Sequence, residues 1–123
     1  MCPKEANIFL AEDNGNNLEL KRKILTRGGH TIVKEAYTQE DALASIHHFE
    51  ELHVDVAVLD ANLTPGAYDG QDGVALATAI REKAPDVKIV GMSSNPFPKE
   101  APIDVDVSRS DKYLRAAQII DQI

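Results

Sequence analysis

The chain has 123 residues, enough for one domain with one core, and carries a formal net charge of -7. This acidic balance excludes the basic footprint that binding to nucleic acid or to an anionic membrane requires. The single cysteine, Cys2, excludes an internal disulfide, and no apolar run has the length of a membrane span or a signal-peptide core. We therefore expect one cytoplasmic domain over residues 1–123 with no attached output domain.

Short apolar runs alternate with helical patterns in the first half of the chain. Residues 8–11 predict a strand that ends in Glu12 and Asp13, and residues 14–17 offer N-cap side chains for a following helix. The apolar stripe of this helix, which we expect to end at Gly28, contains Leu18, Leu20, Ile24 and Leu25.

A brief strand over residues 31–33 comes next, followed by a second helix. Thr38 and Asp41 have the spacing of a capping box, with Asp in place of Glu. The apolar face predicted for this helix contains Ala42, Leu43, Ile46 and Phe49.

The run over residues 54–59 is apolar almost throughout and is followed directly by Asp60. Such a run is typical of a strand that is covered on both faces of a parallel sheet. A carboxylate at its end would be desolvated by its neighbours, which indicates a functional role. Asp60 is therefore the first candidate site residue.

The second half of the chain continues the alternation. Asp72 and Gly73 open a third helix that runs through Arg81, and residues 87–92 predict a fourth strand ending at Ser93. Residues 103–108 predict a fifth strand. Ser110 and Asp111 cap a last helix, which carries Leu114, Ala117 and Ile120.

Strands that alternate with helices predict an α/β fold with a parallel sheet. The carboxyl ends of parallel strands lie at one edge of the sheet, which is where ligands bind in open α/β folds. Glu12, Asp13, Asp60 and Ser93 are therefore expected to converge there, although they lie far apart in the sequence.

Clustered carboxylates favour a cation, and hard oxygen ligands suit Mg²⁺, which combines one or two carboxylates with a substrate phosphate. A carboxylate beside such an ion can act as a nucleophile and carry an acyl phosphate. Ser93 could then hold a phosphoryl oxygen, and Asn62 could offer its backbone carbonyl to the metal. The pattern is typical of a phosphoryl acceptor.

Over nearly its whole length the chain resembles the receiver domain of two-component response regulators. The matching features are the acidic pair Glu12-Asp13, the acceptor Asp60 and the hydroxyl of Ser93, each after its expected strand. The resemblance implies a flavodoxin-like, doubly wound sheet of order 2-1-3-4-5. It also implies Mg²⁺ held by Asp13, Asp60 and the Asn62 carbonyl, with Glu12 acting through water. A histidine kinase or a histidine phosphotransfer protein would donate the phosphoryl group. Phosphorylation would then change the affinity of the domain for an unknown downstream protein.

The chain departs from the family in four ways. Arg109 stands where the family has a lysine after the fifth strand, with Lys112 as the alternative cation. Asp106 stands where the family favours an aromatic residue. The loop after Asp60 is long, and the three prolines within residues 95–102 predict that the fourth helix is short or absent.

Other interpretations remain open from the residues alone. Glu12 and Asp13 could form a solvated helix start, Asp60 and Ser93 could be turn residues, and Arg109 could be solvated. The domain could also be a degenerate receiver that docks partners without phosphorylation. A third alternative is a Mg²⁺-dependent phosphatase, because residues 60–64 half-resemble an Asp-x-Asp-x-Thr motif.

Overall fold

The computed structural model describes residues 5–66, 68–108 and 111–123, which form a five-stranded parallel sheet of order β2-β1-β3-β4-β5. The strands are β1 (Asn7–Ala11), β2 (Thr31–Ala36), β3 (Val56–Leu59), β4 (Lys88–Gly91) and β5 (Val105–Asp106). The helices are α1 (Gly15–Arg27), α2 (Gln39–Ser45), α3 (Gln71–Lys83) and α4 (Ala116–Ile120), with short 3₁₀ helices η1 (Ile46–His48) and η2 (Tyr113–Arg115). The predicted doubly wound fold is confirmed. Within the described residues, no helix is long and apolar enough to cross a bilayer.

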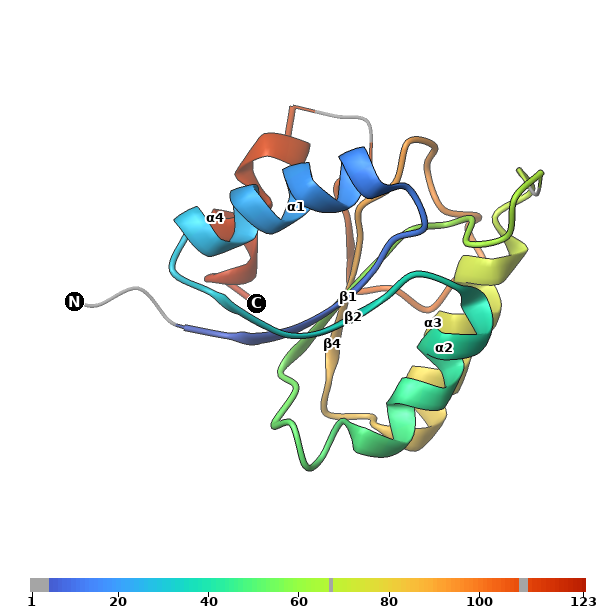
Figure 1. Ribbon diagram of the computed structural model, residues 1–123, viewed down its shortest axis with the longest axis horizontal. Coiled ribbons are helices and arrows are strands. Elements are labelled where there is room, and N and C mark those ends of the chain that lie inside the picture. The colour runs from blue at the N-terminus through green and yellow to red at the C-terminus, as the bar shows by residue number, and fades with distance from the viewer. Residues whose placement is uncertain (1–4, 67, 109–110) are drawn as a thin grey trace.

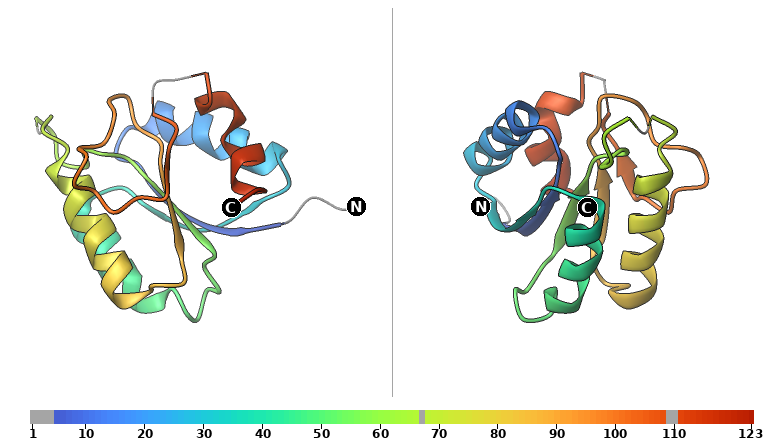
Figure 2. Two further views of the ribbon diagram at one scale, coloured as in Figure 1. Left: turned by 180° about the vertical axis from the view of Figure 1, so that it is seen from behind. Right: turned by 45° about the vertical axis from the view of Figure 1, so that its right-hand side comes forward.

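The sheet is covered on both faces, with α1 and α4 on one side and α2 and α3 on the other (Figure 1; Figure 2). Beyond their first residues the central strands are apolar, because successive side chains enter opposite cores. In β1, Phe9 packs in the core beneath α2 and α3, whereas Ile8 and Leu10 pack in the core beneath α1 and α4. This two-sided burial explains why residues 54–59 carry so few polar side chains.

Side-chain caps set the starts of two helices as predicted. Asn14 caps α1, and its Oδ1 accepts hydrogen bonds from the backbone N–H groups of Asn16 and Asn17. Thr38 caps α2 by accepting from the N–H of Asp41. These caps satisfy N–H groups that have no partner within the helix.

Two apolar residues assigned to helix stripes face solvent instead. Leu20 is 44% exposed, and the buried face of α1 contains Lys21 in addition to Leu18 and Leu25. Leu114 is 68% exposed, because the last helical segment begins as the 3₁₀ helix η2 and becomes α-helical only at Ala116. The predicted cap at Ser110 lies outside the described residues.

The connection between β4 and β5 contains no helix, in agreement with the prolines, and every residue of it is described. Phe97 is buried and substitutes for part of the missing helix by packing over Gly91 and Gly73. A Cβ atom at either glycine would lie within 3.0 Å of the Phe97 ring, so a larger residue at either position would displace the ring. Only residues 105 and 106 of the predicted strand 103–108 pair as a strand.

Asp104, just before β5, ties the edge of the sheet to α3. Its Oδ2 accepts from the Ile89 N–H at 2.8 Å and from Arg81 at 2.9 Å. Partial burial raises the pKa of the Asp104 carboxyl, but these two donors outweigh burial and hold the pKa below its ordinary value. The carboxylate therefore stabilises the fold above the ordinary pKa of aspartate, and this contribution is lost as the pH falls through the lowered pKa.

Replacing Asp104 by Asn is expected to lower the free energy of unfolding by about 1 kcal/mol at pH 7, a value that allows for solvent screening. Urea denaturation at pH 7 and pH 2.5 measures the difference. The difference in the free energy of unfolding between the variant and the wild type should disappear at the lower pH. A gap that stays constant would contradict the electrostatic explanation.

Candidate functional site

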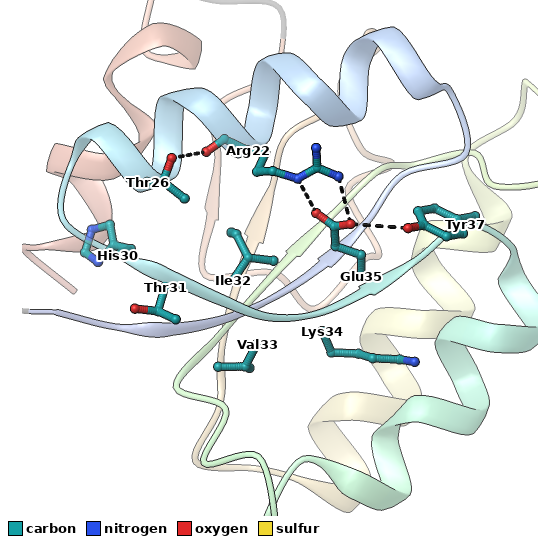
Figure 3. Close-up of a pocket in the computed structure, with 9 residues that line it drawn as sticks. All are labelled: Arg22, Thr26, His30, Thr31, Ile32, Val33, Lys34, Glu35 and Tyr37. Atoms are coloured by element: carbon teal, nitrogen blue, oxygen red, sulfur yellow. Dashed lines mark hydrogen bonds and ion pairs between the residues drawn. The ribbon is translucent and has the colours of Figure 1, made fainter.

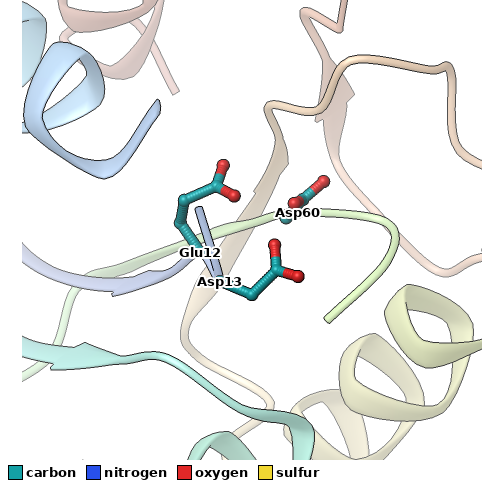
Figure 4. A group of neighbouring side chains, drawn as sticks. All are labelled: Glu12, Asp13 and Asp60. Carbon is teal, nitrogen blue, oxygen red and sulfur yellow. The ribbon is translucent and has the colours of Figure 1, made fainter. Parts of the chain in front are cut away.

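Three carboxylates from two separate parts of the chain meet at the carboxyl edge of the sheet. Glu12 and Asp13 follow β1, and Asp60 follows β3, which pairs with β1 in parallel register. One carboxylate oxygen of each residue lies within 4.8 Å of the others (Figure 4). The convergence expected from the sequence is present in the structure.

These residues line a cavity of 370 Å³. Its opposite wall comes from the loop after β3, including Asn62 and Tyr68, and from Ser93 and Asn95 after β4. Glu12 and Asp60 are buried at 1% and 8% exposure, whereas Asp13 is exposed. The cavity therefore offers one accessible carboxylate and two desolvated ones.

Glu12 forms a buried ion pair with Lys21, which lies on the buried face of α1. The Lys21 Nζ is 2.5 Å from Glu12 Oε1, and both side chains are almost fully buried. Glu12 Oε2 accepts from the Asn14 N–H. Burial raises the pKa of the Glu12 carboxyl to about 7; the Lys21 ammonium opposes this effect and the Asp60 charge adds to it. Lys21 is a charged neighbour of the site that the sequence pattern did not identify.

Asp60 is bound to the hydroxyl that follows the next strand. Ser93 is 2% exposed, and its Oγ donates to Asp60 Oδ1 at 2.5 Å. Within the described residues, Asp60 Oδ2 has no hydrogen-bond donor, so it is the oxygen that can approach a ligand in the cavity. β3 and β4 are neighbours in the sheet, which is why Asp60 and Ser93 meet.

The loop after Asp60 is folded back on itself by its own polar side chains. Asn62 Oδ1 accepts from the Gly70 N–H, and Asp72 Oδ2 accepts from the Leu63 N–H. The Gly73 N–H donates to the carbonyl of Ala61 at the start of α3. These bonds fix the backbone around Asn62 beside the carboxylates, although its carbonyl remains only a predicted ligand.

Tyr113 in η2 is a second residue that the sequence did not identify. Burial raises the pKa of its hydroxyl to about 12, and the charges of Glu12 and Asp60 add to the effect. The sequence around Tyr113 gives no signal that this residue lies near Glu12 and Asp60. The proximity arises only because η2 packs against the sheet.

The cation expected near the phosphoryl group is not placed by the structure. Arg109 lies outside the described residues. Lys112, the alternative, is exposed and lines a separate depression with Val105 and Ile119. It does not line the described part of the carboxylate cavity.

A larger hollow of about 720 Å³ lies along β2 and α1, and two of the charged residues that line it, Arg22 and Glu35, are paired with each other. Arg22 binds both carboxylate oxygens of Glu35, at 2.6 and 2.8 Å, and the Tyr37 hydroxyl donates to the same side chain (Figure 3). The Arg22 hydrogen bond lowers the pKa of the Glu35 carboxyl, which burial would otherwise raise. This pairing leaves the carboxylate cavity as the better candidate for chemistry.

A doubly wound parallel sheet with three carboxylates at its carboxyl edge defines an α/β domain of the flavodoxin-like class. The family model for the response regulator receiver domain matches residues 8–107, and the chain belongs to this family. The resemblance identified from the sequence is thereby confirmed. A search of curated proteins gave no significant match.

Solved receiver structures share the fold at low sequence identity. The isolated REC domain of RcsB from Salmonella enterica serovar Typhimurium, with the phosphomimetic BeF₃⁻, has a TM-score of 0.74 and 22% identity, over 97% of this chain and 89% of that chain. A chain of the CheX–CheY–BeF₃–Mg complex from Borrelia burgdorferi has a TM-score of 0.76 and 15% identity, over 95% and 87%. The receiver domain of the putative response regulator NarL from Mycobacterium tuberculosis gives 0.71 and 19%, over 98% of both chains.

Proposed function

We propose that this receiver domain accepts a phosphoryl group on Asp60 and thereby changes its affinity for a downstream protein. The main support for the proposal is the burial and hydrogen bonding of the Asp60 side chain. Its side chain is buried beside two further carboxylates, its Oδ1 is fixed by Ser93, and its Oδ2 has no donor among the described residues. A desolvated, oriented carboxylate is a competent nucleophile.

The donor set fits Mg²⁺, the ion that receiver domains bind at an acidic pocket. All the candidate ligands are hard oxygens, and the three carboxylate oxygens are close enough to surround one small cation. Asp13, Asp60 and the Asn62 carbonyl would hold the ion, with Glu12 acting through water because Lys21 occupies one of its oxygens. When bound, the ion would neutralise the charge that develops on the phosphoryl oxygens.

The residues of the chain have separate roles in the transfer of the phosphoryl group. Asp60 Oδ2 attacks phosphorus, an O–P bond forms, and the P–N bond to the histidine donor breaks, leaving neutral imidazole after proton uptake from solvent. The Ser93 hydroxyl turns from Asp60 Oδ1 to a phosphoryl oxygen. Arg109, or alternatively Lys112, would pair with another oxygen. A histidine kinase or a histidine phosphotransfer protein is the proposed donor.

A second candidate function is a docking module that works without phosphorylation. The buried pair of Lys21 and Glu12 favours it, because an internal cation already neutralises one carboxylate of the cluster. The phosphatase alternative has less support, because the family is a signalling domain and Asp60 follows the third strand of the chain rather than the first.

The test is the intact mass of the protein after incubation with a small phosphoryl donor, with and without Mg²⁺. We expect one phosphoryl adduct in the presence of Mg²⁺ and none when the ion is removed by chelation. A folded protein that acquires no adduct under either condition would contradict the proposal and leave the docking module as the better account.

A further inference from the structure

Lys21 occupies a position at which α1 packs against the sheet. It lies on the buried face of the helix with Leu18 and Leu25, which belong to the core beneath α1 and α4. The Lys21 side chain is only 1% exposed. An apolar side chain at this position would be buried without the desolvation penalty that an ammonium group carries. The presence of a lysine here therefore needs an explanation other than packing.

The Lys21 ammonium and the Glu12 carboxylate depend on each other. Within the described residues, Glu12 Oε1 is the one acceptor in contact with the Lys21 Nζ, at 2.5 Å. The other carboxylate oxygen, Oε2, accepts from the Asn14 N–H at 3.1 Å. Turning the carboxylate away from Lys21 would leave a buried ammonium group without a partner, which is costly. Both oxygens of Glu12 are therefore held by the protein itself.

This ion pair lies beside the proposed cation site. An oxygen of Glu12 lies within 4.8 Å of oxygens of Asp13 and Asp60, so Glu12 is close enough to bind the same cation directly (Figure 4). The bonds to Lys21 and Asn14 restrain it from doing so. When all four side chains are ionised, the ammonium group also cancels one of the three negative charges. Lys21 thus limits both the number of free ligands and the charge of the site.

We propose that Lys21 is a positioning residue that keeps Glu12 out of direct coordination and thereby makes the site prefer Mg²⁺ to Ca²⁺. The inference rests on the proposed function, because it concerns the metal site of that function. With Glu12 withheld, the protein offers the carboxylates of Asp13 and Asp60 and the carbonyl of Asn62, and water would supply the remaining ligands. Mg²⁺ accepts such a set because it retains several waters. Ca²⁺ takes roughly six to eight oxygen ligands and gains more from an added carboxylate.

Four variants separate this role from a general effect of charge or folding. Lys21→Met and Lys23→Met each remove one positive charge from α1, but Lys23 forms an exposed ion pair with Glu19. Lys21→Gln is a milder change, because glutamine keeps an N–H donor for Glu12 while removing the charge. The double variant Glu12→Gln/Lys21→Met lacks the carboxylate that Lys21→Met is expected to release.

The measurement is the affinity of the unphosphorylated protein for Mg²⁺ and for Ca²⁺, by isothermal titration calorimetry at pH 8 and constant ionic strength. Lys21→Met should bind Ca²⁺ about a hundredfold and Mg²⁺ about tenfold more tightly than wild type, because the site gains a negative charge and a carboxylate ligand. Lys21→Gln should show smaller gains in the same order. Lys23→Met should stay within about twofold of wild type for both ions. In the double variant the extra gain for Ca²⁺ should be lost.

An unchanged ratio of the two affinities in the Lys21 variants would overturn the proposal, since a purely structural role for Lys21 would not alter ion preference. Lys21→Gln decides the outcome if Lys21→Met does not fold. A gain for Ca²⁺ that persists in the double variant, or the absence of binding of either ion to the wild type and to both single Lys21 variants, would also overturn it.

This test uses no phosphoryl donor, so it is separate from the test of phosphorylation. A protein that shows the expected order of affinities but forms no phosphoryl adduct would contradict the proposed function alone. A wild type that forms the adduct, together with Lys21 variants of unchanged ion preference, would contradict the role of Lys21 alone.

Discussion

Asp60→Asn is expected to acquire no detectable phosphoryl adduct under conditions that label the wild type, a loss of at least about a thousandfold. The amide oxygen is a poor nucleophile and carries no charge. The shape is kept, so Ser93 can still donate to Oδ1 and the fold should be retained. Intact mass spectrometry over a time course gives the rate.

The matched control is Asp69→Asn. Asp69 lies in the loop after β3, is exposed, and accepts a single N–H from Gln71. This variant should be labelled at the wild-type rate. Equal labelling of Asp60→Asn and wild type would place the acceptor elsewhere in the chain.

Lys21→Met is expected to lower the free energy of unfolding by about 3 kcal/mol at pH 8, because it leaves the Glu12 carboxylate buried without a partner. Methionine keeps most of the volume, so little of this loss comes from packing. Urea denaturation, with the slope checked for two-state behaviour, measures the difference. The control is Lys23→Met, because Lys23 and Glu19 on the same helix form an exposed ion pair whose loss should cost no more than about 0.5 kcal/mol.

The effect of Lys21→Met should depend on pH with a definite sign. The Glu12 pKa of about 7 lies above the ordinary value of 4.5, so the folded protein holds a proton there that the unfolded chain releases. Ionisation of Glu12 therefore costs stability as the pH rises through this window, and Lys21 limits that cost. The destabilisation should shrink between pH 8 and pH 5. A Lys21→Met variant within 0.5 kcal/mol of wild type at pH 8 would contradict a stabilising ion pair.

The meeting of Asp60 with Glu12 and Asp13 could be predicted from a local pattern, an apolar run followed by a carboxylate. The order of the sheet was predicted only from the resemblance to receiver domains. Parallel topology then brings the strand ends together without further information. The same logic placed Ser93 beside Asp60, and the structure confirms this contact.

Lys21 could not be predicted in the same way. A lysine within a helix is normally assigned to the solvent face, and the neighbouring Leu20 matched the apolar stripe better. Lys21 is buried because the tertiary structure places Glu12, which follows β1, next to the buried face of α1. Asp106 is similar, because the hydrogen bond that it accepts from the Phe97 N–H forms only where Phe97 folds back onto Gly91.

Chemical mapping of the adduct tests Asp60 as the phosphoryl acceptor most directly, because Asp60→Asn removes a proposed metal ligand as well as the proposed acceptor. Reduction of the phosphorylated protein with borohydride converts an aspartyl phosphate to homoserine, and peptide mass spectrometry then locates the converted residue. We expect homoserine at position 60 alone, dependent on Mg²⁺. Conversion at Asp13, or an adduct that resists reduction, would contradict Asp60 as the phosphoryl acceptor.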